Sequence, residues 1–75
     1  MDVYSKKIDA GHGEHILITN SNKIIIHQFL KAKNGSYTGN GNPAIIGKKI
    51  EELKKFRKVS GTRADCIIDC YLDRE

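Results

Sequence analysis

Two neighbouring apolar runs constrain the fold of this chain more than any other feature of its sequence. Residues 14–19 read EHILIT and residues 23–30 read KIIIHQFL, with Asn20-Ser21-Asn22 between them. β-Branched residues favour strands, and asparagine tolerates the left-handed backbone that tight turns require. The pattern therefore predicts a β-hairpin, and with it a sheet at the centre of the fold.

The length of the turn decides which side chains share a face of the hairpin, because a shift of one residue exchanges the two faces. A three-residue loop places four isoleucines on one face: Ile16, Ile18, Ile24 and Ile26. The other face then carries Leu17, Thr19, Ile25, His27 and Phe29. We therefore expect both faces to be apolar, which is unusual for a sheet with one face in water.

A helix is predicted over residues 43–59. Asn42 suits the N-cap and Pro43 suits the first helical position. Apolar residues then recur at helical spacing until Ser60-Gly61, where glycine supplies the usual signal for a helix end. No other segment of the sequence is predicted to be helical.

Two further strands complete the expected order β-β-β-α-β. Residues 2–9 indicate an extended first strand, and residues 62–73 alternate cleanly between two sides, a period of two. Residues 33–42 indicate a glycine-rich polar loop between the hairpin and the helix. We therefore expect one small α+β domain over residues 1–75, in which a small antiparallel sheet packs on one amphipathic helix.

Size and composition favour a binding protein over an enzyme. With 75 residues, the expected stability is only about 4–11 kcal/mol, which leaves little core to give up to a deep active site. The sequence has no apolar run near 18 residues and no apolar region of a signal peptide. We therefore predict no membrane partner and a cytoplasmic location, where Cys66 and Cys70 would stay reduced.

The second face of the sheet is one candidate site, because a single helix covers only one face. Leaving several large apolar side chains together in water is costly, so we expect something to cover this face. The predicted protein-interface residues are Leu17, Ile25, His27, Phe29 and Tyr71. A second copy of the chain, a different protein, the loop over residues 33–42 or strong coiling of the sheet could each provide the cover.

Positive charge is the basis of the other candidate site. Residues 43–63 contain seven lysines and arginines against Glu51 and Glu52, while the whole chain has a net charge of +4. The predicted nucleic-acid-binding residues are Lys48, Lys54, Lys55, Lys58 and Arg63. A solvated helix face, partly neutralised by pairs four residues apart, is the alternative reading. Phe56 is expected in the core, which argues against a platform for stacking bases.

Metal and catalytic sites are not predicted. His12, His15, Cys66 and Cys70 are zinc-type ligands, but on a strand the two cysteines would lie about 13 Å apart. We read the cysteines as small core residues and expect no cofactor. The histidines have no partner that the sequence identifies, so no catalytic residue is assigned, although a small basic ribonuclease remains an alternative.

These observations predict a non-catalytic binding module. Its most favoured role is nucleic-acid binding or regulation through the basic helix. The alternative is a small protein-binding inhibitor or adaptor of the kind made by phages and mobile elements, such as an anti-defence protein. That protein would act through the apolar sheet face, as a monomer or as a homodimer, or would bind an acidic protein surface through its positive charge.

Overall fold

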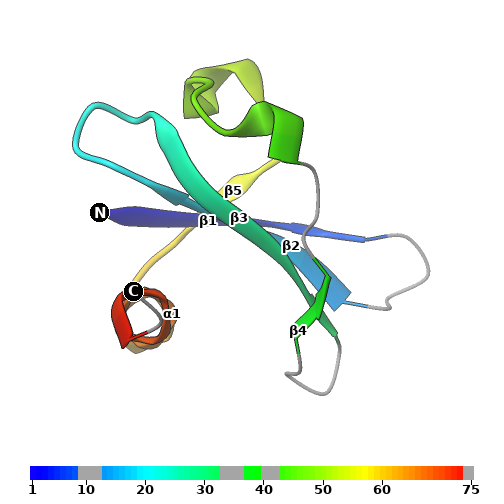
Figure 1. Ribbon diagram of the computed structural model, residues 1–75, viewed down its shortest axis with the longest axis vertical. Helices are drawn as coiled ribbons and strands as arrows, with labels where there is room; N and C mark the ends of the chain where they lie inside the picture. The colour runs from blue at the N-terminus through cyan, green and yellow to red at the C-terminus, as the bar shows by residue number, and fades with distance from the viewer. Residues whose placement is uncertain (9–12, 33–36, 40–42, 74–75) are drawn as a thin grey trace.

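The computed structural model describes residues 1–8, 13–32, 37–39 and 43–73. Within these residues, five strands form one antiparallel sheet in the order β4-β3-β2-β1-β5. The strands are β1 (Asp2–Lys7), β2 (Gly13–Thr19), β3 (Ile25–Ala32), β4 (Tyr37–Gly39) and β5 (Arg57–Val59). Two 3-10 turns, η2 (Pro43–Ile45) and η3 (Ile50–Glu52), precede β5, and the helix α1 (Thr62–Asp73) follows it. Figure 1 shows α1 on one side of the sheet and the two 3-10 turns on the other.

The predicted fold class is confirmed: the chain is a small α+β domain in which an antiparallel sheet packs on one amphipathic helix. The predicted first strand appears as β1, and the predicted hairpin appears as β2 and β3. The segment predicted as a polar loop contains β4, while its remaining residues, 33–36 and 40–42, lie outside the described residues. Within the described part of the chain, no helix has both the length and the apolar character needed to cross a membrane.

The predicted helix over residues 43–59 is wrong. Gly47 adopts a φ of 94°, in the left-handed region, and this breaks a right-handed helix after its first turn. The backbone here bonds to the beginning of β3 instead: Gly47 N donates to Ile25 O at 2.8 Å, and Ile25 N donates to Lys48 O at 2.9 Å. We call residues 43–56 the covering segment, since they lie across one face of the sheet.

The predicted last strand over residues 62–73 is also wrong, because this segment is α1. Ala64 and Ile67 are buried, and Ile68 and Tyr71 pack against the same core. These four positions follow the spacing i, i+3, i+4, i+7, which makes one apolar stripe on a helix. The helix therefore follows the last strand, whereas the predicted order placed it before that strand; the three predicted strands before it are present and the short strand β4 is additional.

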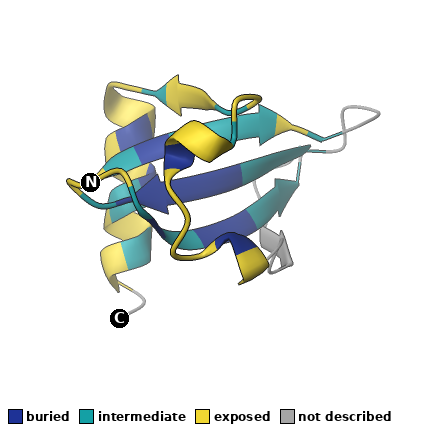
Figure 2. Ribbon diagram, turned by 90° about the horizontal axis from the view of Figure 1, so that it is seen from above, coloured by how far each residue is buried: buried dark blue, intermediate teal, exposed yellow. Residues whose placement is uncertain are grey.

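Two apolar clusters stabilise the sheet, one on each face. Figure 2 shows buried residues in the strands, in α1 and in the 3-10 turns. The cluster beneath α1 contains Val3, Ile16, Ile18, Phe29, Ala64 and Ile67. The cluster beneath the covering segment contains Leu17, Ile25, Ile45 and Ile50. Leu17 and Ile25 are 0% exposed, so the face that the sequence left without a cover is closed by the chain itself.

A β-bulge in the hairpin explains why the predicted faces are only partly right. The pairing runs Ile18 with His27 but Thr19 with Ile25, so Ile26 is an additional residue in β3. Ile16, Ile18 and Ile26 do share the side of α1, and Leu17 and Ile25 share the other side, as predicted. Phe29 was predicted beside Leu17 but lies under α1, because the bulge exchanges the faces along the rest of β3.

Candidate functional site

A hollow with strongly positive walls lies where β1 ends and α1 begins. Its volume is about 530 Å³. Its described lining residues are Ser5, Lys6, Lys7, Glu14, Lys55, Arg57 and Arg63. We call this site the basic hollow. It draws on β1, β2, the turn before β5, β5 itself and the first turn of α1, so residues far apart in the sequence meet there.

The strand register brings the cations of the basic hollow together. Lys7 pairs with Glu14 across β1 and β2, and Ser5 pairs with Arg57 across β1 and β5. β1 therefore contributes its last residues to both neighbours at the same end of the sheet. Ser5 and Lys7 lie on the same face of β1, because side chains alternate along a strand. The helix α1, which contains Arg63, packs over that face.

The charge of the basic hollow is uneven, with five cationic side chains against a single described carboxylate, Glu14. Arg63 pairs with Glu14. The hydrogen bond from Arg63 lowers the pKa of Glu14 most, and a bond from Ser5 and the charge of Lys31 lower that pKa further. The same bond raises the pKa of Arg63. Glu14 therefore remains ionised and neutralises one of the five cations, Arg63.

The other four cations of the basic hollow take no part in an ion pair among the described residues, although the Lys6 ammonium lies over the Phe56 ring. Among the described residues, the ion pairs are Arg63 with Glu14 and Lys58 with Asp2. Neither pair involves Lys6, Lys7, Lys55 or Arg57. Four positive charges around one concavity repel each other, and they attract an anion with several negative oxygens.

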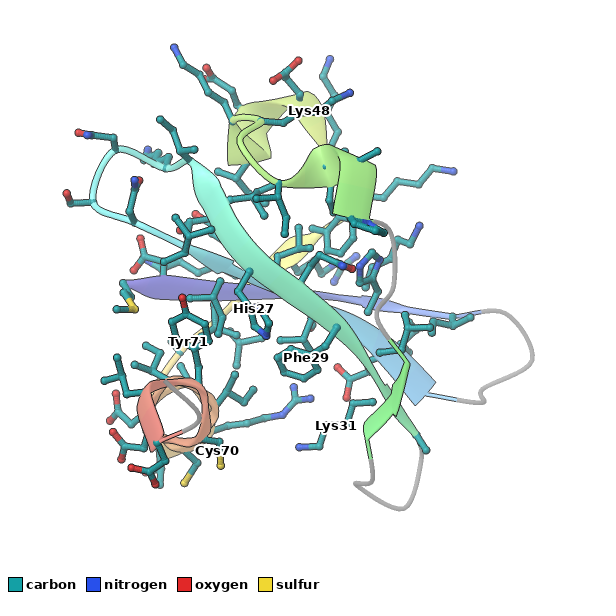
Figure 3. All side chains as sticks on the ribbon, viewed as in Figure 1. His27, Phe29, Lys31, Lys48, Cys70 and Tyr71 are labelled. Carbon is teal, nitrogen blue, oxygen red and sulfur yellow. The ribbon has the colours of Figure 1, made fainter. Side chains whose placement is uncertain are left out.

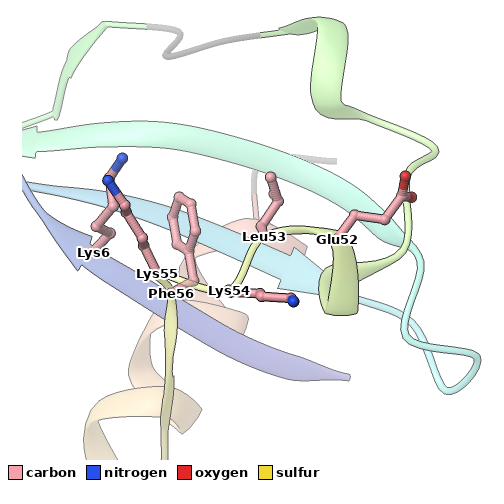
Figure 4. Close-up of a pocket in the computed structure, with 6 residues that line it drawn as sticks. All are labelled: Lys6, Glu52, Leu53, Lys54, Lys55 and Phe56. Atoms are coloured by element: carbon pink, nitrogen blue, oxygen red, sulfur yellow. The ribbon is translucent and has the colours of Figure 1, made fainter.

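A second hollow, drawn in Figure 4, shares lining residues with the first and has a more apolar wall. Its volume is about 350 Å³, and its described lining residues are Lys6, Glu52, Leu53, Lys54, Lys55 and Phe56. We call this site the Phe56 hollow. Lys6 and Lys55 line both hollows. The two sites therefore form one continuous surface with a charged part and an aromatic part.

Phe56 is half-buried, which is more exposed than the core position that the sequence suggested. One part of its ring packs against the cluster of Leu17 and Ile25. The edge contact with the His15 ring has a centroid separation of 5.3 Å, and Lys6 Nζ lies 5.4 Å from the ring centroid. An aromatic ring with a lysine above it thus sits inside the basic surface.

The predicted nucleic-acid-binding residues do not form one group. Lys55 and Arg63 line the basic hollow, and Lys54 lines the Phe56 hollow. Lys58 is exposed and lies 3.7 Å from Asp2. Lys48 lies on the outer side of the covering segment, across the sheet from α1 (Figure 3).

Three cations of the basic hollow were not predicted from the sequence: Lys6, Lys7 and Arg57. The predicted cations lie in or just after one expected helix, whereas these residues come together through strand pairing. The signal available was the adjacent pair Lys6-Lys7 at the end of the predicted first strand, facing Glu14 at the start of the hairpin. Without the order of the strands, that signal does not identify Arg57 as a neighbour.

The predicted protein-interface residues are divided between the two cores. Leu17 and Ile25 are fully buried beneath the covering segment, so a partner would reach them only if that segment moved away. The His27 ring lies 5.6 Å from Phe29 and 4.7 Å from Tyr71, between the sheet and α1 (Figure 3). The assumption of an uncovered apolar face, on which this interface depended, is wrong for the described chain.

The zinc-type ligands also lie apart. Cys66 and Cys70 are exposed on α1, not in the core as predicted. His15 is on the opposite face, where its Nε2 lies 2.8 Å from the amide oxygen of Gln28. His12 lies outside the described residues. Within the described ranges, no three histidine, cysteine or acidic side chains are grouped so that they could hold a metal ion.

Comparison with known proteins adds no relative to this description. No family model matches the chain, and no match is found among curated proteins or solved structures.

Proposed function

We propose that this chain binds nucleic acid by holding backbone phosphates in the basic hollow. The observation that carries the proposal is the convergence of five cationic side chains on one concavity with a single described carboxylate. Nucleic acid presents closely spaced negative charges, and binding them releases condensed counterions. Two of the five cations are arginines, Arg57 and Arg63, whose planar groups can donate two hydrogen bonds to one phosphate.

The distribution of charge on α1 supports one orientation of the ligand. Asp65, Asp69 and Asp73 follow each other at every fourth residue and are exposed, so they form a negative stripe along the helix. This stripe repels phosphates from the outer side of α1. The nucleic acid would therefore approach from the side of Arg63 and the edge strand β5, where the cations are.

An acidic protein surface is the competing partner, since it also carries negative charge. Carboxylates on a folded protein are more widely spaced than phosphates along a strand, and fewer of them would reach one concave site. Four cations that line one hollow and take no part in an ion pair among the described residues therefore favour phosphates. Competition separates the two partners: polyglutamate should displace a labelled oligonucleotide far less effectively than an unlabelled oligonucleotide does.

The salt dependence of binding tests the proposal. Fluorescence anisotropy with a labelled oligonucleotide, repeated over a range of salt, gives the slope of log K against log salt. With about four phosphates engaged, the slope for a duplex should be about −3 to −4. Arg57→Gln should reduce the slope by about 1, and adding Lys7→Gln should reduce it by about 1 more.

Lys48→Gln is the matched control, because it removes the same charge from an exposed residue outside both hollows. We expect this variant to keep the slope of the unsubstituted chain. Equal losses from Lys48→Gln and Arg57→Gln would show that only net charge matters, and the basic hollow would then have no specific role. Absence of any salt-sensitive binding would contradict the proposal as a whole.

A further inference from the structure

The two hollows share a wall, and this arrangement has a consequence for the type of nucleic acid bound. Lys6 and Lys55 line both sites. A ligand that fills both would need an anionic part for the basic hollow and an adjacent flat, apolar part for the Phe56 hollow. A nucleotide in a strand has this composition, since each phosphate is followed by a sugar and a base.

The Phe56 ring has a surface that can receive such a group. The ring packs against the Leu17 and Ile25 cluster, which holds it in place, and it is half-buried. Lys6 Nζ, 5.4 Å from the ring centroid, marks the side that faces solvent, because a lysine keeps its charged end in water while its stem lies on apolar surface. The ring is therefore both rigidly held and reachable.

Leu53 extends the apolar floor beside Phe56, as Figure 4 shows. It is half-buried and packs against the same cluster. Glu52 lines the hollow too, and its Oε2 already accepts a hydrogen bond from Lys49 N at 3.1 Å. The hollow of about 350 Å³ falls at the lower end of the range for small-ligand sites, which suits a group the size of one base.

We propose that the Phe56 hollow holds an unpaired nucleobase stacked on Phe56, with its neighbouring phosphates in the basic hollow, so that the chain selects single strands over duplexes. This inference rests on the proposed function and narrows its ligand. In a duplex, both faces of a base are covered by its neighbours in the stack, so the base cannot lie on a protein ring without leaving the helix. In a single strand the faces are accessible, and stacking on an aromatic side chain is tolerant of sequence.

Lys6 would change partners when the base arrives. In the free protein its ammonium lies over the Phe56 ring, and a base on that ring would take the same place. Because Lys6 also lines the basic hollow, its ammonium can turn there and pair with the phosphate of the incoming nucleotide. The Lys6 charge would therefore have a partner both before the nucleotide binds, the Phe56 ring, and after it binds, the phosphate.

The test uses four probes of about ten nucleotides. Three have the same sequence, as single-stranded DNA, single-stranded RNA and a DNA duplex, and the fourth is an abasic single strand. We expect the unsubstituted chain to bind both single strands about tenfold more tightly than the duplex or the abasic strand. A preference for the DNA or the RNA strand would identify the natural source, and either one supports the inference.

Phe56→Leu and Phe56→Tyr separate stacking from packing. Leucine keeps apolar contact with the cluster beneath and loses the ring face, so we expect single-strand affinity to fall about tenfold with duplex and abasic affinity unchanged. Tyrosine keeps the ring and should retain single-strand binding. A 2-aminopurine in the strand gives a direct readout, since its fluorescence should be quenched by the unsubstituted chain and not by Phe56→Leu.

The outcomes are distinguishable from failure of the proposed function. Equal binding of single strand and duplex, or an equal loss for all probes in Phe56→Leu, would overturn the inference and leave phosphate binding in place. Binding to none of the four probes would overturn both. Circular dichroism on each variant shows whether the fold is kept, and the comparison of single-stranded, abasic and duplex probes on the unsubstituted chain decides the inference if Phe56→Leu unfolds.

Discussion

Leu17 offers the most direct test of how the sheet is covered. Its side chain is 0% exposed and packs in one cluster with Ile25, Ile45 and Ile50. Leu17→Ala removes about three methylene equivalents, worth about 2.4 kcal/mol in transfer free energy. The cavity left beneath the covering segment adds to this, so the total loss should be about 3–4 kcal/mol. That is a large part of the total stability of about 4–11 kcal/mol for a chain of this length.

Urea unfolding followed by far-ultraviolet circular dichroism measures the loss, and it suits a chain without tryptophan. With an m-value of about 1 kcal/mol/M, the midpoint should fall by about 3 M. Ile46→Ala is the matched control from the covering segment: Ile46 is 46% exposed, so its truncation should change stability by less than about 0.5 kcal/mol.

Protein concentration adds a second test of the same reasoning. Because the chain's own residues 43–56 provide the cover, the midpoint should be the same at low and high protein concentration. A midpoint that rises with concentration would show that association contributes to the cover. A loss below about 1 kcal/mol for Leu17→Ala would refute the burial argument itself, since a fully enclosed leucine cannot be truncated at so small a cost.

Three further substitutions have definite expected outcomes. Asn20→Ala should cost about 1–2 kcal/mol in urea unfolding, because the Asn20 side-chain oxygen accepts hydrogen bonds from the backbone of the turn at 2.9 and 3.0 Å. Gly13→Ala should cost more, since φ is 147° and an added Cβ would lie 2.1 Å from Lys31 O; a soluble variant of unchanged midpoint would disprove this. Glu14→Gln should strengthen oligonucleotide binding a few-fold, because Arg63 is released from its pair. The pKa of Glu14 is lowered in the folded protein, so its ion pair with Arg63 stabilises the fold at pH values above the ordinary pKa of a glutamate. This stabilisation is lost as the pH falls through the lowered pKa of Glu14. Glu14→Gln should remove this pH dependence of stability, which is worth less than about 1 kcal/mol at a partly exposed site.

The hairpin could be predicted from the sequence because its signals agree with each other. The β-branched runs favour strands and the asparagine turn joins them, and the structure places both strands as expected. The bulge at Ile26 could not be predicted in the same way. It lies beside Ile25, whose backbone bonds to Gly47 and Lys48, residues that the hairpin sequence alone does not contain.

The exchange of helix and strand after residue 43 shows where local patterns fail. Residues 62–73 satisfy two periods at once: the alternating set that favours a strand shares Ala64 and Ile68 with the helical stripe. Tertiary contact decides between them, since α1 buries Ile67 against the sheet. In the covering segment, Gly47 was the informative residue, because glycine inside a helix costs about 1 kcal/mol and here serves a turn.

The candidate site was only partly predictable for a related reason. Charge density along the sequence indicated Lys55 and Arg63, which line the basic hollow. Lys7 and Arg57 meet in the same hollow only because β1 is paired on both sides. Strand order is a property of the whole fold, so a site built across strands is invisible to a search along one element.

The position of β1 between β2 and β5 also governs the sequence of events when the polypeptide is made. Val3, close to the beginning of the chain, pairs with Val59 on β5. During synthesis, β1 can join the hairpin early, but its outer edge keeps unpaired amide and carbonyl groups until β5 has left the ribosome. Such an edge is open to strands from other nascent chains. The long separation between paired partners therefore slows the closing step of folding and prolongs the time in which this edge is exposed.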